Sequence, residues 1–131
     1  MTRHADLIAA AREASRRAYA PYSHFRVGAA VRSAGGAVFA ACNVENASYG
    51  LACCAERNAV FQMVAAGETS FEVVAIYTPT PTPTAPCGAC RQVLYEFNPV
   101  GVVVSACDGI EVIETTVTDL LPGAFGPKSL S

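Results

Sequence analysis

Three cysteines and one glutamate have the types and spacing of a metal centre that can do chemistry. Cys54 lies two residues before Glu56, and Cys87 and Cys90 follow further along in a Pro-Cys-Gly-Ala-Cys segment. Three thiolates fill three of the four tetrahedral positions of a zinc ion and leave the fourth open, as in catalytic zinc sites. Glu56 is close enough to that open position to move protons there without binding the metal. The pattern therefore predicts a catalytic Zn²⁺ site.

The Cys-x-x-Cys segment taken alone leaves other interpretations open. At the start of a helix it is also typical of a thioredoxin-like redox pair or of half a structural metal site. Cys53 is a rival ligand to Cys54, but neighbouring helical residues point about 100° apart, so both do not easily reach one ion. A redox pair would leave Cys54 and Glu56 without a role, which favours the catalytic zinc interpretation.

The apolar pattern predicts the elements that must position these side chains. It indicates helices at 3–18, 52–66, 87–97 and 117–121, and strands at 25–32, 37–42, 71–77, 100–106 and 110–115. Cys54 and Cys87 then lie at helix starts, where the helix dipole favours thiolates. Strands that alternate with helices predict an α/β fold, a three-layer α/β/α sandwich with a mixed sheet of about five strands, with 71–77 as a central strand.

Length and composition set the remaining limits. A chain of 131 residues predicts a single domain, 1–131, and its 52% hydrophobic content favours association with further copies of itself. No apolar run reaches the length of a membrane span, and no signal peptide is apparent, so we expect a cytoplasmic protein with reduced cysteines. The net charge of −2, without a basic cluster, argues against a nucleic-acid partner.

Four blocks of the sequence resemble those of the small cytidine deaminases, in the order of that family. They are Phe25–Ala30 (FRVGAA), Cys42–Gly50 (CNVENASYG), Cys54–Ala59 (CAERNA) and Pro86–Leu94 (PCGACRQVL). Leu120-Leu121-Pro122 and Phe125-Gly126 also resemble the end of the family's chain. The zinc deaminases share the Glu-containing first ligand segment followed by Pro-Cys-x-x-Cys.

This resemblance implies the same fold, a zinc cofactor held by Cys54, Cys87 and Cys90, and the hydrolysis of a nucleoside in pyrimidine salvage. Cytidine and 2′-deoxycytidine would give uridine and 2′-deoxyuridine with release of ammonia. In that chemistry a zinc-activated hydroxide attacks carbon 4 of the cytosine ring. The catalytic residue Glu56 would take the proton, pass it to ring nitrogen 3 and protonate the departing ammonia.

The resemblance also implies a substrate-binding set. Phe25 would stack on the pyrimidine, Asn43 and Glu45 would bind the ribose hydroxyls, and the Ala55 N–H would bind the base carbonyl. Without the resemblance, Phe25 could be an ordinary core residue, and Asn43 and Glu45 could be turn formers. The family's homotetramers further imply that Phe125 reaches the active site of a neighbouring subunit. The alternative for Phe125 is packing on its own subunit.

Two arginines follow the ligand segments. Three thiolates and a divalent cation sum to −1, and Arg57 and Arg91 could each donate to sulfur and draw charge from the metal. The resemblance implies this role for Arg57, whereas the alternative is an ordinary surface arginine. Within the deaminases, enzymes acting on nucleoside-like antibiotics or on polynucleotides remain alternatives. Cys42, Cys53 and Cys107 are interpreted as small buried apolar residues.

Overall fold

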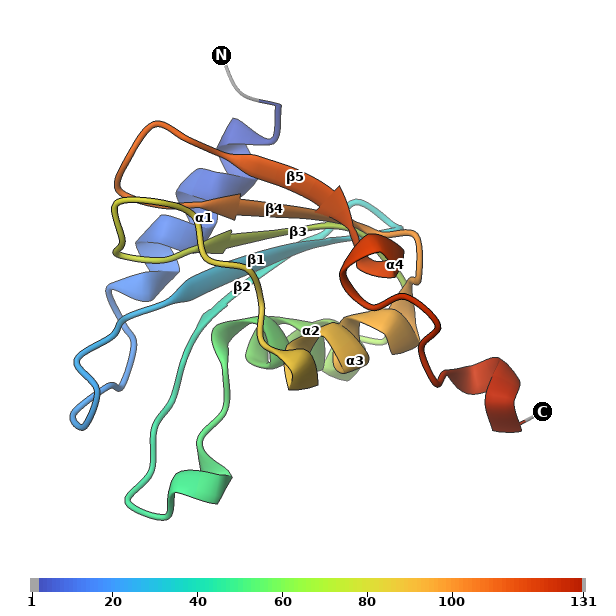
Figure 1. Ribbon diagram of the computed structural model, residues 1–131, viewed down its shortest axis with the longest axis horizontal. Coiled ribbons are helices and arrows are strands. Elements are labelled where there is room, and N and C mark those ends of the chain that lie inside the picture. The colour runs from blue at the N-terminus through green and yellow to red at the C-terminus, as the bar shows by residue number, and fades with distance from the viewer. Residues whose placement is uncertain (1–2, 131) are drawn as a thin grey trace.

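A five-stranded mixed sheet supports the rest of the chain (Figure 1). The structure, a computed structural model, describes residues 3–130, so the predicted domain limits of 1–131 extend beyond it at both ends. In spatial order the strands are β2 (Val38–Cys42), β1 (Gly28–Ser33), β3 (Phe71–Tyr77), β4 (Val102–Ala106) and β5 (Ile113–Thr116). Only β3 and β4 run parallel, and the other neighbours are antiparallel. The predicted mixed sheet with 71–77 at its centre is confirmed.

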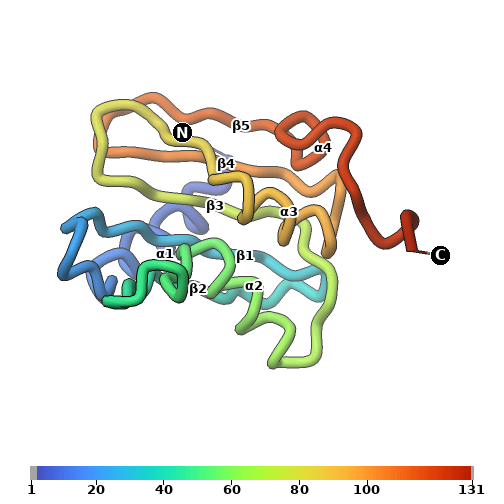
Figure 2. The backbone as a smooth tube through the Cα atoms, turned by 60° about the horizontal axis from the view of Figure 1, so that its bottom comes forward, coloured from blue at the N-terminus to red at the C-terminus, as the bar shows by residue number. Residues whose placement is uncertain are grey.

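Helices cover both faces of the sheet and make the predicted three layers. Helix α1 (Ala5–Ser15) packs on one face, and α2 (Ala55–Ala65), α3 (Gly88–Phe97) and the short α4 (Val117–Leu120) lie on the other (Figures 1 and 2). Successive side chains of a strand point to opposite faces, so β3 contributes to both cores. Val74 and Ile76 belong to the core with α2 and α3, whereas Ala75 belongs to the core with α1.

Helix α1 lies unusually close to strand β1 because Gly28 has no side chain. A Cβ atom at this position would lie 1.8 Å from the carbonyl oxygen of Ala11 and 2.8 Å from the backbone nitrogen of Ser15. The helix could not keep its place against a larger residue, so Gly28 determines the spacing between the first helix and the sheet.

The first strand begins three residues later than predicted, at Gly28 instead of Phe25. His24 has a left-handed backbone with φ of 58°, which turns the chain away from the extended conformation. The side chain of Asn43 binds the N–H of Val27 and the carbonyl oxygen of Phe25. Backbone pairing with the chain at the end of β2 reaches only as far as the Val27 carbonyl, which accepts from the Asn43 N–H at 3.2 Å. The prediction was wrong here because a side-chain interaction replaced strand pairing, and Phe25 is thereby placed outside the sheet.

Helix α2 also begins later than predicted, at Ala55 instead of Ala52. Cys53 forms an antiparallel bridge with Val44, with N···O distances of 2.9 and 3.0 Å, and this keeps the chain extended up to Cys54. Cys54 is thus the N-cap of α2, and Cys87 is the N-cap of α3. At the other end of α2, the positive φ of 93° at Gly67 confirms the predicted glycine stop.

Strand β3 has the predicted bounds, 71–77, whereas α1 at Ala5–Ser15 and β5 at Ile113–Thr116 are shorter than predicted. A 3₁₀ turn, η1 (Tyr49–Leu51), lies in the loop before α2. After α4 the chain leaves the sheet without regular structure until a second 3₁₀ turn, η2 (Pro127–Leu130), which projects from the body of the molecule (Figures 1 and 2). Within residues 3–130, no helix has the length and apolar character needed to cross a bilayer.

Candidate active site

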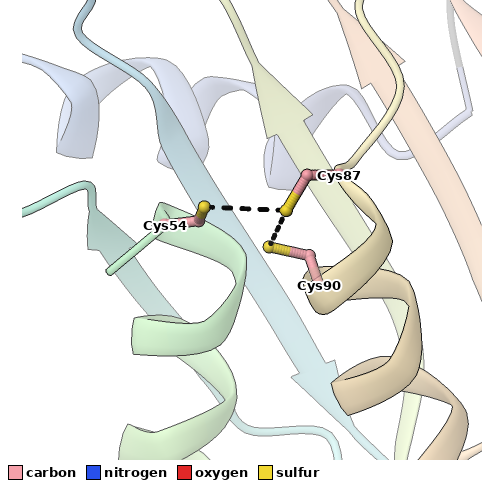
Figure 3. A group of neighbouring side chains, drawn as sticks. All are labelled: Cys54, Cys87 and Cys90. Carbon is pink, nitrogen blue, oxygen red and sulfur yellow. Dashed lines mark hydrogen bonds between the residues drawn. The ribbon is translucent and has the colours of Figure 1, made fainter. Parts of the chain in front are cut away.

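The three predicted ligand cysteines converge where α2 and α3 begin (Figure 3). The Sγ atom of Cys54 lies 3.8 Å from that of Cys87, which lies 3.4 Å from that of Cys90. All three sulfur atoms lie within 4.8 Å of one another. Since two helix N-termini point at this cluster, their unpaired N–H groups and dipoles favour negative charge on the sulfur atoms.

Cys53 and Cys42 lie outside this cluster. Of the residues that the structure describes, only Cys54, Cys87 and Cys90 form a group of three or more potential ligands around one point. Cys53 is half-buried and engaged in the bridge to Val44, and Cys42 is also half-buried, so neither is the buried residue that was predicted. Cys107 is buried as predicted. The geometry therefore favours Cys54 over Cys53 as the third ligand.

The electrostatics of the cluster favour a thiolate on Cys54. A hydrogen bond from the thiol of Cys90 is the main cause that lowers the pKa of Cys54 to about 5, and Arg57 acts in the same direction. The Nη2 atom of Arg57 donates to Cys54 Sγ at 3.5 Å. The same contact raises the pKa of Arg57, which remains positively charged beside the sulfur. The pKa of Cys90 is raised, chiefly because it donates to Cys54.

The dimensions and charges of the cluster fit a zinc ion. Thiolates held tetrahedrally at the usual Zn–S length of about 2.3 Å are about 3.8 Å apart, close to the sulfur separations found here. The three thiolates and the ion would sum to −1, which Arg57 compensates. The Nε atom of Arg57 is buried without a hydrogen-bond partner among the described residues, so this guanidinium has donor capacity left beside the sulfur atoms. With three ligands, the set matches a catalytic site and not a closed structural one.

Arg91 has a different task from the one predicted. Its Nε atom donates to the carbonyl oxygen of Pro86 at 2.7 Å, and its Nη1 atom donates to that of Leu120 at 2.9 Å. No hydrogen bond from Arg91 to a cysteine sulfur exists among residues 3–130. The suggested bond from Arg91 to sulfur is thus not formed in this structure, where Nε and Nη1 bind backbone carbonyls instead. It ties the segment before Cys87 to the end of α4.

Glu56 is almost fully buried, with 5% of its surface exposed, in the first turn of α2. Burial is the main cause that raises the pKa of its carboxyl group, and the charge of Cys54 acts in the same direction. Burial of an unpaired carboxyl group costs folding free energy, so its presence here indicates a functional role. Its position beside the cysteines and its raised pKa suit a residue that accepts and then releases a proton.

A cavity of about 480 Å³ opens beside the cysteines, within the range of small-molecule sites. It lies beyond the carboxyl end of β3, where ligands commonly bind in α/β sheets. Its lining residues are Ser23, Phe25, Val27, Asn43, Glu45, Cys54, Ala55, Glu56, Ile76, Thr78, Thr84, Ala85 and Cys87. The structure thus brings Phe25, Asn43, Glu45 and Ala55 together with Glu56 around one cavity.

Sequence reasoning missed several lining residues. Ser23 and Val27 flank Phe25 on the chain, Ile76 and Thr78 lie at the end of β3, and Thr84 lies in the loop before Cys87. For Ser23, Val27 and Thr84, proximity along the chain to a predicted site residue was the available signal, whereas Ile76 and Thr78 offered none. Their side chains carry no distinctive chemistry, so only the folded cavity identifies them.

The two polar residues predicted for ribose are also bound to their own chain. The Oδ1 atom of Asn43 accepts from the N–H of Val27 at 2.9 Å, and its Nδ2 atom donates to the Phe25 carbonyl at 2.8 Å. The Glu45 carboxylate accepts from the N–H groups of Tyr22 and Ser23. The turn-forming and substrate-binding interpretations are therefore compatible, since both side chains hold the loop and face the cavity.

Phe125 is the one predicted substrate-binding residue that does not line this cavity. Its surface is 60% exposed in the single chain, and its carbonyl oxygen accepts a hydrogen bond from Nε2 of Gln92 at 2.8 Å. The next residue, Gly126, contacts the ring of Tyr95, where a Cβ atom would lie 2.5 Å from the ring. The backbone of the tail is thus anchored on α3, while Phe125 itself is largely exposed in the single chain.

A three-thiolate cluster with a buried glutamate, at the edge of a cavity in a three-layer α/β sandwich, defines a zinc-dependent enzyme of the deaminase type. Residues 1–106 match the family model described as the cytidine and deoxycytidylate deaminase zinc-binding region. The chain belongs to this family.

Individual relatives extend over nearly the whole chain. A cytidine deaminase of Sporosarcina psychrophila is 45% identical over 127 residues, which cover 95% of this chain and 93% of the relative. The crystal structure of cytidine deaminase from Burkholderia pseudomallei has a TM-score of 0.90 at 52% identity, covering 95% of this chain and 100% of that one. The structure from Mycobacterium tuberculosis has a TM-score of 0.82 at 37% identity, with 96% and 99% covered.

Proposed function

We propose that this protein is a zinc-dependent cytidine deaminase that hydrolyses cytidine and 2′-deoxycytidine to uridine and 2′-deoxyuridine and releases ammonia. One observation carries the proposal: a single cavity beside the cysteine cluster is lined by two of its members, by the buried Glu56 and by four of the five residues expected to bind a nucleoside. We assign Cys54, Cys87 and Cys90 as zinc ligands. The proposal treats the whole chain, 1–131, as one deaminase domain.

The chain's own residues account for the steps around the reacting atoms. Zinc, when bound by the three thiolates, supplies a Lewis acid that makes water nucleophilic near neutral pH. Glu56, buried beside the cluster, accepts the proton of the attacking water and delivers it to nitrogen 3 of the pyrimidine. It then takes the remaining proton from the new hydroxyl group on carbon 4 and gives it to the amino group, so the carbonyl forms as the carbon–nitrogen bond breaks and ammonia leaves. Arg57 stays protonated and stabilises the negative charge on Cys54.

The substrate is held through both its base and its sugar. Phe25 offers its ring to the pyrimidine face, and the Ala55 N–H, in the first turn of α2, is free to bind the base carbonyl. Asn43 and Glu45 offer their remaining hydrogen-bonding capacity to the sugar hydroxyls. The test is to incubate the zinc-loaded protein with cytidine and to monitor the ultraviolet absorbance of the nucleoside. Failure to consume cytidine would contradict the proposed function.

Replacement of Glu45 with alanine is expected to lower turnover of cytidine by at least about tenfold, because a site built to bind hydroxyl groups loses much when they are unpaired. Asn43→Ala should also impair turnover, in part because its amide positions Phe25. Zinc content should stay nearly unchanged and the variants should remain folded, and Glu72→Ala, at an exposed position on β3, is the matched control. Free cytosine should be a poor substrate. Equal turnover of cytosine and cytidine would instead indicate a nucleobase deaminase.

We further propose that the protein is a homotetramer with composite sites, in which Phe125 closes the cavity of a neighbouring subunit. The exposure of its ring and the anchored backbone beside it support this arrangement, since a large apolar group held outward usually meets a partner. Light scattering should report four chains per particle, whereas a fully active monomer would refute the assembly.

The role of Phe125 in a partner's site can be tested with mixed tetramers. Cys54→Ala chains lack a working zinc site but keep Phe125, and Phe125→Ala chains keep the zinc site. If Phe125 acts across subunits, activity per zinc site in the mixture should exceed that of tetramers made of Phe125→Ala chains alone. Unchanged activity per site would mean that Phe125 serves its own subunit.

The cellular setting follows from the same reaction. Conversion of cytidine to uridine belongs to pyrimidine salvage, which we place in the cytoplasm. The net charge of −2 gives no basic surface for a nucleic acid, so the proposed partners are the nucleoside and further copies of the chain, without a membrane or nucleic acid.

A further inference from the structure

The hydroxyl group of Ser23 links two parts of the candidate site. It accepts a hydrogen bond from the N–H of Phe25 at 3.0 Å and donates one to Oε2 of Glu45. Because its acceptor side is occupied by Phe25, the hydroxyl hydrogen is directed to the carboxylate. Ser23 also lines the cavity beside the cysteines.

Both oxygen atoms of Glu45 are held by the same turn. Oε1 accepts from the backbone N–H groups of Tyr22 and Ser23, at 3.0 and 3.1 Å, while Oε2 accepts from the Ser23 hydroxyl. The Ser23 hydrogen bond is the main cause that lowers the pKa of Glu45, so the carboxylate stays ionised. An ionised carboxylate accepts about four hydrogen bonds. Three are used here, which leaves capacity for a hydroxyl group in the cavity.

The backbone around Ser23 keeps this geometry in place. His24 adopts a left-handed conformation with φ of 58°, and its N–H donates to the Ala20 carbonyl at 3.0 Å. This turn brings the Phe25 N–H back to the Ser23 hydroxyl. On the other side, the Phe25 carbonyl is held by Asn43 at 2.8 Å. A left-handed histidine is unusual and persists only where the surroundings support it.

We propose that Ser23 is a positioning residue for sugar recognition, which aligns the Glu45 carboxylate with a hydroxyl group of the nucleoside sugar. This inference rests on the proposed function, because it takes Glu45 as the residue that binds the sugar. Without the Ser23 hydroxyl, Oε2 loses its only protein partner among the described residues, and the carboxylate can rotate away from the substrate. Ser23 is exposed and lies outside every helix and strand, so its replacement leaves both cores untouched.

The test compares Ser23→Ala with wild type on cytidine and on 2′,3′-dideoxycytidine, which lacks both ring hydroxyls. The alanine variant should lose about five- to tenfold in kcat/KM for cytidine, mainly through KM, which corresponds to one net hydrogen bond. For the dideoxynucleoside, which offers Glu45 no ring hydroxyl group to bind, the loss should shrink to less than about twofold. That is below the effect of one net hydrogen bond. Ser23→Thr, which keeps the hydroxyl, should retain most of the activity on cytidine. Ser70→Ala, at an exposed serine beside the opposite end of β3, is the matched control.

A double variant shows whether Ser23 acts through Glu45. If it does, Ser23→Ala should cost little further activity in the Glu45→Ala background. Additive losses in the double variant would overturn the inference, and so would equal losses on both nucleosides in Ser23→Ala. In either case, turnover of cytidine by the wild-type protein would leave the proposed function intact. If the wild-type zinc protein did not deaminate cytidine at all, the proposed function would fall and this inference with it.

Discussion

Replacement of Glu56 with glutamine is expected to lower kcat on cytidine by at least ~10²-fold, the usual contribution of a well-placed acid–base group. Glutamine has nearly the same shape, so the variant should fold normally and keep its zinc. Its amide cannot accept the proton of the attacking water or release one to the base. Because this carboxyl group is only 5% exposed, bulk buffer has little access to take over its task.

Zinc analysis, circular dichroism and single-turnover kinetics together separate chemistry from folding in this experiment. Glu72→Gln changes an exposed carboxylate on strand β3 and should behave as wild type. Near-normal turnover by a zinc-replete Glu56→Gln protein would contradict the proposed mechanism.

Loss of bound zinc is the expected result for alanine at Cys54, Cys87 or Cys90. Each supplies one of three thiolates, and with only two left the ion is held too weakly to survive dialysis. Activity should fall to background in all three variants. The measurements are zinc per chain by elemental analysis and cytidine turnover before and after zinc is added back.

Cys53→Ala is the matched control, since it changes the neighbouring thiol without touching the cluster. Its bridge to Val44 uses backbone atoms and should survive the substitution. The ligand assignment would be wrong if Cys53→Ala lost zinc while Cys54→Ala retained it. Chelation of the wild-type protein should reproduce the inactive state, and added zinc should reverse it.

Much of the site was predictable because its chemically distinctive residues lie close together in short segments of the sequence. The spacing of Cys54 from Glu56, and of Cys87 from Cys90, is local, and each pair lies at a helix start that local patterns also indicate. The apolar stretch 71–77 predicted a central strand because both of its faces are buried. Local sequence therefore determined which cysteines cluster, which glutamate is buried beside them and the layers that carry them.

Element boundaries and hydrogen-bond partners were decided by tertiary structure. Strand β1 and helix α2 begin later than predicted because Asn43 binds the Phe25 segment and because Val44 pairs with Cys53. Arg91 has the residue type to donate to sulfur, yet two backbone carbonyls occupy it. Propensity is a weak local preference, and a hydrogen bond to a distant segment overrides it.

The hydrogen bonds that join the Phe25 segment to Asn43 and to Glu45 also arise only in the folded chain. Ser23 and Glu45 are 22 residues apart, and Asn43 and Val27 are 16 residues apart, so no local spacing shows that they bond. Their meeting depends on the left-handed turn at His24 and on the position at which β2 ends. The sequence by itself determined which groups can do the chemistry. Packing of the helices and the sheet decided which of them meet, because side-chain hydrogen bonds require angles and distances that a linear pattern does not specify.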